Sequence, residues 1–294
     1  MKTVSVIIPT FNNESTIESV IISVQEQTYS KLEIILIDNG STDATCRIIK
    51  KLAAYDNRIK LLHSANGRSI ARNMGLKFAK GDFIQFLDSD DILFSKKIER
   101  AVNFLNKNQD YYAYACNVVY LDVLKKLKFK KLVNYRYSNH LLAANPFPIN
   151  SLIFRNAGVR LFNESYKYNE DWLFWTDNLI NKKVAFSDEF DAEVRVTGNN
   201  TMVDYESMHV YQVFIRSLIK KKYKRYDVQL FIRDCHLGVQ YLSFKQPNGY
   251  MRDLIEKELR FELNLMQLLL HFNFIRHYFD MKEIKDKSKY LYHN

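Results

Sequence analysis

Three carboxylates stand together in the segment FIQFLDSDDILF, residues 83–94. Asp88, Asp90 and Asp91 directly follow apolar residues of the kind that form an interior β-strand. Side chains alternate along an extended backbone, so Asp88 and Asp90 are expected on the same side. Neighbouring carboxylates repel unless a cation lies near them, and hard divalent ions such as Mg²⁺ or Mn²⁺ prefer oxygen ligands. The spacing therefore indicates a divalent metal site, and helix capping by Asp91 or Ser95 is the alternative.

Polar residues also follow two other apolar runs. The run VSVIIP at 4–9 leads towards Phe11, and the run LEIILI at 32–37 leads into Asp38 and Asn39. The carboxyl ends of parallel strands meet at one edge of a sheet, where ligands of such sheets bind. We therefore expect these residues to share an edge with the three carboxylates.

Strands and helices that would position these residues alternate along the first third of the chain. Strands are predicted at 4–9, 32–37, 59–63 and 82–88. Helices are predicted at 14–27, at 69–81 and after Ser95, and one more helix is predicted to run from N-cap candidates at 41–43 through Leu52. Continuous apolar strands joined by helices are typical of a parallel sheet with both faces covered. The sequence therefore predicts an α/β fold with a mostly parallel sheet flanked by helices.

The pattern changes in the rest of the chain. We expect strands at 111–123, within 145–158 and, as short pieces, at 185–196, a helix beginning at 170, and no defined element for the basic run 123–137. Beyond 203 the pattern is helical, and Leu259, Leu263, Met266 and Leu270 fall on one stripe. We predict one domain over 1–202, with halves 1–110 and 111–202, followed by a helical region over 203–294.

Positive charge is concentrated in this C-terminal region. The net charge is +10, and residues 203–294 hold 16 Lys/Arg against 11 Asp/Glu. The segment at 215–226 contains no acidic residue. It contributes six cations: Arg216, Lys220, Lys221, Lys222, Lys224 and Arg225. The charge indicates an anionic partner, with a solvated helix face as the alternative. A membrane surface or a lipid diphosphate is favoured, because no nucleic-acid recognition motif accompanies the charge.

Composition excludes several classes of protein. Hydrophobic residues make up 47% of the 294 residues, which argues against a disordered chain. Cys46, Cys116 and Cys235 show no metal-binding spacing and no disulfide framework. We find no signal peptide and no run of roughly 18 apolar residues, so the expected location is the cytoplasm, with peripheral contact at the inner face of the membrane.

Four segments together resemble the family 2 glycosyltransferases. They are VSVIIPTFNNE, LIDNGSTD, NGRSIARNMGLKFAKGDFIQFLDSDD and NEDWLFW, in that order and spacing. The resemblance is close over 1–110 and looser over 145–202. It implies the GT-A fold and an inverting transfer from a nucleotide-sugar donor, with a UDP-sugar favoured.

The resemblance also implies roles for single residues. The nucleotide-sugar contacts would be Pro9, Phe11, Glu14, Asp38, Asn39, Arg72, Asp88 and Ser89. Asp90 would bind Mn²⁺ or Mg²⁺, and Asp171 would be the catalytic base. The alternatives are a surface position for Arg72 and, for Glu170 and Asp171, simple stabilisation of a helix N-terminus.

Two positions depart from the family pattern. Asn39 stands where the family usually has a second aspartate facing uracil, and an amide can still pair with a base. Thr197 stands two residues after Arg195, where many members carry a histidine that reaches the metal or diphosphate. The metal would then depend on Asp90, phosphate oxygens and water.

The favoured function is therefore transfer of a sugar to a glycan, lipid-linked or protein-linked acceptor in the synthesis of surface polysaccharide or glycoconjugate. One alternative is a sugar nucleotidyltransferase, although PTFNNES lacks its Gly-rich, basic phosphate loop. The other is a non-catalytic accessory subunit, and a homo-oligomer is left open. Donor hydrolysis products would separate the three functions.

Overall fold

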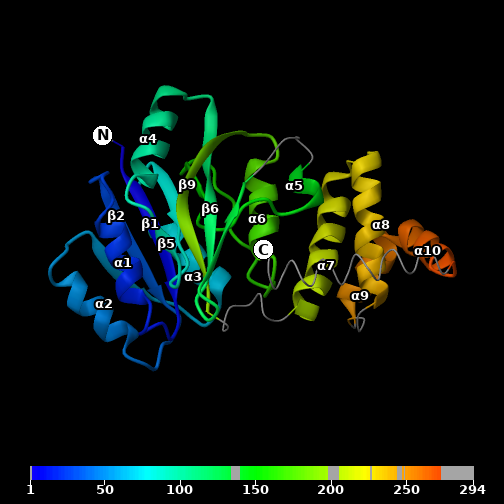
Figure 1. The fold of residues 1–294 in the computed structure, drawn as a ribbon, viewed down its shortest axis with the longest axis horizontal. Helices are drawn as coiled ribbons and strands as arrows, with labels where there is room; N and C mark the ends of the chain where they lie inside the picture. The colour runs from blue at the N-terminus through cyan, green and yellow to red at the C-terminus, as the bar shows by residue number, and fades with distance from the viewer. Residues whose placement is uncertain are drawn as a thin grey trace. The chain divides into compact units, whose positions relative to one another are not determined.

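The computed structural model describes residues 2–133, 140–197, 205–225, 227–243, 247 and 249–272. The chain divides into two compact units, coloured from blue to red along the chain in Figure 1. The first, here called the sheet unit, comprises residues 1–136 and 146–197, and the second, the helical unit, comprises 137–145 and 198–294. The domain boundary predicted at 202 lies outside the described residues.

The sheet unit begins with four parallel strands. They are β1 (Val4–Thr10), β2 (Leu32–Asp38), β3 (Ile59–His63) and β4 (Phe83–Phe86), in the order β3-β2-β1-β4. All residues of β1, β2 and β4 are buried, as expected for apolar strands covered on both faces. The strands predicted at 4–9, 32–37 and 59–63 are confirmed to within one residue.

Helices α1 (Ile17–Gln25), α2 (Thr45–Ala53) and α3 (Arg68–Phe78) connect these strands. Helices α1 and α2 contact each other, whereas α3 packs on β1 and β2. The approach of α3 is close at Gly75, where an added Cβ would lie 2.3 Å from Cγ2 of Ile7. Only glycine permits this approach, which sets the position of α3 against β1.

The second half of the sheet is mixed. It continues from β4 through β8 (Leu152–Arg155), β6 (Tyr111–Asp122), β9 (Lys183–Val196) and β5 (Ile92–Leu93). Strand β8 is antiparallel to β4 and β6, and β9 runs parallel to β6 and antiparallel to β5. The residues that we expected to form short strands at 185–196 belong to one long strand, whose pairing with β6 shifts register three times.

Three further elements complete the sheet unit. Strand β7 (Leu127–Lys131) forms a hairpin with β6, in the run for which the sequence predicted no element. Helix α4 (Lys97–Lys107) packs on β6, and α6 (Glu170–Leu179) starts where a helix was predicted. The predicted cap at Ser95 is wrong, because the N-cap of α4 is Lys96 and makes no side-chain capping bond.

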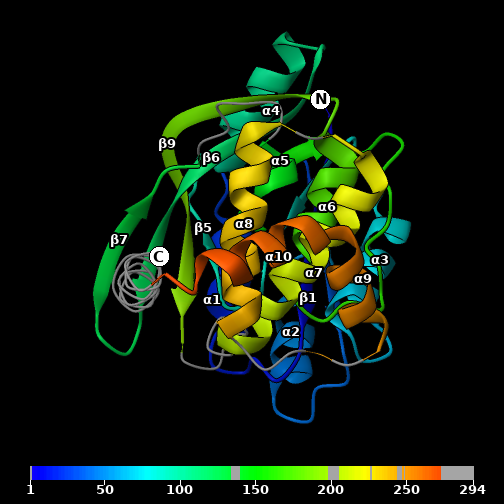
Figure 2. The same ribbon diagram turned by 90° about the vertical axis from the view of Figure 1, so that its right-hand side faces the viewer.

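The helical unit contains α5 (His140–Ala143), α7 (Tyr205–Tyr223), α8 (Val228–Ser243), α9 (Tyr250–Glu258) and α10 (Arg260–Leu269). Figure 2 shows α10 crossing α8, the helix on which it packs. The predicted domain 1–202 included α5, but α5 packs on α8, where Nε of Arg233 donates to the carbonyl oxygen of Ala143 at 3.1 Å.

The predicted apolar stripe is largely buried inside this unit. Leu259, Leu263 and Met266 are buried, and Leu263 lies against Gly238 of α8. In the same unit, Arg216 forms a buried ion pair with Asp234, with Nε and Oδ1 2.6 Å apart. Within the described residues, no helix is both long and apolar enough to cross a membrane.

Candidate active site

The three carboxylates after β4 lie in a turn. Strand β4 ends at Phe86, and the backbone N–H of Asp91 donates to the carbonyl oxygen of Asp88 at 3.1 Å. The prediction of an extended backbone through Asp90 is therefore wrong, and so is the strand end predicted at Asp88. The turn gives the acids different surroundings: the side chain of Asp88 is 29% exposed, whereas Asp91 is buried.

Asp91 anchors this turn to the second half of the sheet. Its carboxylate accepts hydrogen bonds from Nδ2 of Asn150 and from the backbone N–H of Arg195, both at 3.0 Å. Burial raises the pKa of Asp91 well above its usual value, and the negative charges of Asp90 and Asp88 add to this rise. Asp91 is thus a structural acid, and it does not cap the next helix.

Arg72 joins the acidic turn to the start of α6. Its guanidinium is buried and donates from Nη2 to Oδ1 of Asp88 at 2.7 Å and from Nη1 to Oε1 of Glu170 at 2.9 Å. Burial opposes the charge of Arg72, but Asp88 and Glu170 outweigh it, so the pKa of Arg72 is raised. Burial also works against ionised Asp88, yet Arg72 and Arg68 lower its pKa overall. The surface position considered for Arg72 is wrong.

The adjacent acids of α6 meet different environments. Glu170 is buried, pairs with Arg72, and lies 3.7 Å from Nη1 of Arg68. Asp171 is half-buried, and its Oδ1 accepts a hydrogen bond from the backbone N–H of Trp172. Lys131 of β7 lies near enough for its charge to interact with Asp171: burial lowers the pKa of Lys131, and Asp171 opposes that shift.

Asp38 and Asn39 occupy the end of β2. The Asp38 carboxylate accepts hydrogen bonds from the backbone N–H groups of Gly40 and Ser41. Burial raises the pKa of Asp38, but hydrogen bonds, chiefly from Ser41, outweigh burial and lower it overall. Oδ1 of Asn39 accepts from Oγ of Ser64 at 2.7 Å, which orients the side-chain amide.

The loop after β1 connects these groups to the acidic turn. Phe11 is 47% exposed, whereas Pro9 is buried within β1. Glu14 accepts a hydrogen bond from the backbone N–H of Ala44, just before α2. Oγ of Ser89 donates to Oδ1 of Asn13 at 2.7 Å, so the loop and the turn support each other.

The structure therefore brings the predicted residues to one edge of the sheet unit in three linked groups. The backbone N–H of Asn39 donates to the carbonyl oxygen of Thr10, the last residue of β1. Ser89 donates to Asn13 in the loop that follows β1. Arg72 holds Asp88 and Glu170, next to Asp171. Sequence reasoning did not identify Asn13 or Lys131, because only tertiary contacts reveal their position.

The residues present fit a divalent metal. Asp88 and Asp90 supply carboxylate oxygens, the donors that Mg²⁺ and Mn²⁺ prefer. Burial is the main cause of the raised pKa of Asp91, and the negative charges of Asp90 and Asp88 add to it. A cation bound at Asp90 would offset the negative charge of that carboxylate.

Comparison with known proteins identifies related sequences. The model of glycosyl transferase family 2 matches residues 5–177. An Escherichia coli protein, UDP-Glc:alpha-D-GlcNAc-diphosphoundecaprenol beta-1,3-glucosyltransferase WfaP, is 32% identical over 186 residues, which cover 63% of this chain and 72% of that protein.

Two solved structures have a similar fold. The structure of S. aureus TarS 1–349 in complex with UDP-GlcNAc has a TM-score of 0.61 and 20% identity, over 89% of this chain and 81% of that chain. The mannosyltransferase PcManGT from Pyrobaculum calidifontis, in complex with GDP-Man and Mn²⁺, has a TM-score of 0.60 and 17% identity, over 99% of this chain and 87% of that chain. At these identities the likeness concerns the fold alone.

Proposed function

The chain belongs to glycosyl transferase family 2, and we propose that it transfers a sugar from a UDP-sugar to a lipid-linked acceptor with inversion at the anomeric carbon. The observation that carries the proposal is the contact of Arg72 with both Asp88 and Glu170. It brings the acidic turn after β4 next to Asp171 at the start of α6. This contact supports the proposal because it makes the proposed donor site and the proposed base neighbours in one unit.

The donor is proposed to lie along the edge formed by β1, β2 and β4. Asp38 and the oriented amide of Asn39 would face the base, and Asp88 would hold the ribose or the donor sugar. Arg72 keeps Asp88 ionised and fixed, since the pair is charge-assisted. Mn²⁺ or Mg²⁺ bound at Asp90 would offset the negative charge on the departing diphosphate.

Asp171 is proposed as the general base. Its carboxylate would accept the proton of an acceptor hydroxyl while that oxygen attacks the anomeric carbon and the bond to the diphosphate breaks. A single displacement inverts the anomeric centre. Glu170 is less suited to this role, because its carboxylate is buried and paired with Arg72.

A lipid-linked acceptor is favoured by the relative and by the helical unit. The name of the Escherichia coli relative gives a diphosphoundecaprenol-linked acceptor for that protein. In this chain, α7, α9 and α10 surround a cavity of about 670 Å³, which we call the basic cavity. It is lined by Lys220, Lys224, Arg225, Lys257, Glu258, Arg260, Phe261, Glu262 and Asn264.

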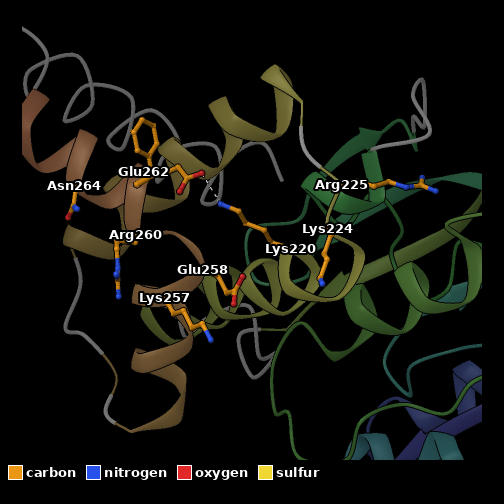
Figure 3. A pocket seen from close by; sticks show the side chains of 9 residues that line it. Lys220, Lys224, Arg225, Lys257, Glu258, Arg260, Glu262 and Asn264 are labelled. Atoms are coloured by element: carbon orange, nitrogen blue, oxygen red, sulfur yellow. Dashed lines mark hydrogen bonds and ion pairs between the residues drawn. The ribbon is translucent and has the colours of Figure 1, made fainter.

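The cations of the basic cavity differ in their surroundings. Figure 3 shows Lys220 directed at Glu262, with Nζ and Oε1 2.8 Å apart. Lys224 is exposed at the end of α7, and Lys257 and Arg260 come from α9 and α10. We propose that the surface around this cavity attracts anionic lipid, which would hold the protein at the inner face of the membrane.

Product analysis tests the proposed function. The purified chain is incubated with a panel of nucleotide sugars, a GlcNAc-diphospho-lipid and Mn²⁺, and products are examined by nuclear magnetic resonance. We expect a β-linked product and UDP from an α-linked UDP-sugar, and loss of turnover in excess chelator and in Asp90→Ala. The fold should survive this substitution, since Asp90 lies in a turn. Retention of configuration, turnover that resists chelator, or pyrophosphate as the product would contradict the proposal.

A further inference from the structure

Three side chains with metal-binding atoms meet where β2, α2 and β3 come together. Asp38 is the last residue of β2, His63 is the last residue of β3, and the two are direct partners in the parallel pairing of these strands. Cys46 is the second residue of α2, and its Sγ lies within 4.8 Å of a binding atom of each of the other two residues. This group has no local sequence signature, because its spacing of 8 and 17 residues matches no metal motif.

The distances suit one small cation. Oδ2 of Asp38 and Nδ1 of His63 are 3.4 Å apart, and the binding atoms of all three residues lie within 4.8 Å of one another. Ligand atoms around a tetrahedral Zn²⁺ are about 3.3–3.8 Å apart, given bonds of roughly 2.0–2.3 Å. A gap as wide as 4.8 Å would have to close by about 1 Å. The side chain of His63 is 60% exposed, so its ring can rotate to close it.

The surroundings of Asp38 already resemble an outer coordination shell. The backbone N–H groups of Gly40 and Ser41 hold its carboxylate in place. Oδ1 accepts the backbone N–H of Ser41 at 3.2 Å, and a carboxylate oxygen that accepts one hydrogen bond retains a second lone pair for a metal. Three protein ligands leave the fourth position of a tetrahedral ion open.

We propose that Asp38, Cys46 and His63 bind a thiophilic divalent cation such as Zn²⁺, and that this cation competes with the nucleotide donor. Thiolate and imidazole ligands select Zn²⁺ over Mg²⁺ or Mn²⁺, so this site is chemically distinct from the carboxylates of the acidic turn. The competition rests on the proposed function, because it requires Asp38 to face the base of the donor. The cation site itself does not depend on that role.

Cobalt spectroscopy tests the cation site without any assay of activity. The full chain, reduced and metal-free, is titrated with Co²⁺, whose bond to a thiolate produces a charge-transfer absorption. We expect this absorption in the wild type and in Cys235→Ser, and its loss in Cys46→Ser. Zn²⁺ should displace Co²⁺, and an excess of Mg²⁺ should not.

A second variant guards against misfolding of Cys46→Ser. His63 is exposed, so His63→Ala should keep the fold. Its affinity for Co²⁺ should fall by at least roughly 10–100-fold, the loss caused by removing even an outer-shell partner of a metal site. An absorption that is absent from the wild type, or that survives Cys46→Ser, would overturn the site.

Titration with UDP separates the site from the competition. We expect saturating Zn²⁺ to weaken UDP binding and UDP to weaken Zn²⁺ binding by the same factor. If both bind without affecting each other, the competition is overturned and the cation site stands. If UDP fails to bind even without Zn²⁺, the proposed donor site is overturned, and the cobalt result still decides the cation site.

Discussion

Glu170 and Asp171 are neighbours at the start of α6, yet their carboxylates differ in burial and in their partners. Glu170 is buried and paired with Arg72, whereas Asp171 is half-buried near Lys131. A general base must reach the acceptor hydroxyl, and a buried, paired carboxylate cannot do so without breaking its ion pair. We therefore propose that Glu170 supports the site through Arg72 and that Asp171 accepts the proton.

Asp171→Asn should lower sugar transfer by roughly 10²–10⁴-fold, the usual contribution of a general base. UDP affinity should remain close to that of the wild type, because the base acts on the acceptor. The measurements are transfer rate and UDP binding by calorimetry. The comparison variant is Glu170→Gln, which should chiefly reduce stability, since it leaves Arg72 with one buried carboxylate fewer. A mild Asp171→Asn beside an inactive but stable Glu170→Gln would reverse the assignment.

Asp91 should give stability a distinct dependence on pH. Its pKa is raised in the folded chain, so above the unfolded value of about 3.9 the folded state binds the additional proton. Asp91 therefore favours folding below that pH, and this contribution is lost as pH rises through the folded pKa. The slope is at most about 1.4 kcal/mol per pH unit.

Asp91→Asn removes this titration and tests it. The carbonyl oxygen of the new amide can still accept from the backbone N–H of Arg195. The side chain of Asn150 can rotate so that its Oδ1, which has no partner among the described residues, accepts a hydrogen bond from the NH₂ group of the new amide. Urea unfolding followed by fluorescence of Trp172 and Trp175 reports on the sheet unit. The stability of the wild type minus that of the variant should fall as pH rises from about 4. A difference independent of pH would refute the role of Asp91.

Single residues were predictable where their chemistry has a local signature. The acids at 88–91 and 170–171 are marked by type and spacing alone. Their division of roles was not, because it depends on Arg72 reaching from α3 to both segments. The roles assigned to site residues by resemblance stay predictions.

At the scale of elements, local periodicity was sufficient for the first half of the sheet. The buried strands β1, β2 and β3 and the helices between them follow from apolar runs, and similarity to known glycosyltransferases confirms the GT-A fold. Strand β7 was missed because three of its five residues, LKFKK, are lysines, and only Leu127 and Phe129 form an apolar face. It is held by pairing with β6, a contact that sequence periodicity does not reveal.

Two helical glycines offer a matched test of element packing. Gly75→Ala puts a Cβ 2.3 Å from Ile7 and should force α3 away from β1, at a cost of about 1–3 kcal/mol. Gly238→Ala meets nothing nearer than Cδ2 of Leu263 at 3.5 Å and should stabilise α8 by roughly 0.4–1 kcal/mol. Hydrogen exchange of amides in α3 and α8 measures both effects.

The two substitutions should also differ in function. Helix α3 carries Arg72, so a shift of α3 should reduce transfer in Gly75→Ala, while Gly238→Ala keeps it. Equal exchange rates in α3 before and after Gly75→Ala would show that the close approach at Ile7 does not position this helix.

At the scale of the whole molecule, the positive charge of the C-terminal region was predictable from the sequence. Which of its cations are paired inside the helical unit and which are exposed was not. Arg216 and Lys220 belong to the basic run, but both pair with Asp234 inside the helical unit. Lys221, Lys222 and Lys224 are exposed, so they are better suited to an external anion. The buried members of the run stabilise the unit, and the exposed members are the ones to test.

Reversing the exposed charges, in the triple variant Lys221→Glu, Lys222→Glu and Lys224→Glu, should reduce binding to liposomes that contain anionic lipid. The matched control reverses Lys51, Lys77 and Lys107, which are exposed in the sheet unit, and changes the net charge by the same amount. Each basic residue near an anionic surface contributes about 1 kcal/mol, so the loss should be large in the first variant and small in the control.

Binding by the wild type should weaken as salt rises. Hydrolysis of the donor without acceptor should be equal in all three proteins, because the proposed donor site lies in the sheet unit. Equal losses of liposome binding in the two variants would attribute the attraction to net charge alone, and unchanged binding in both would remove the membrane from the proposed function.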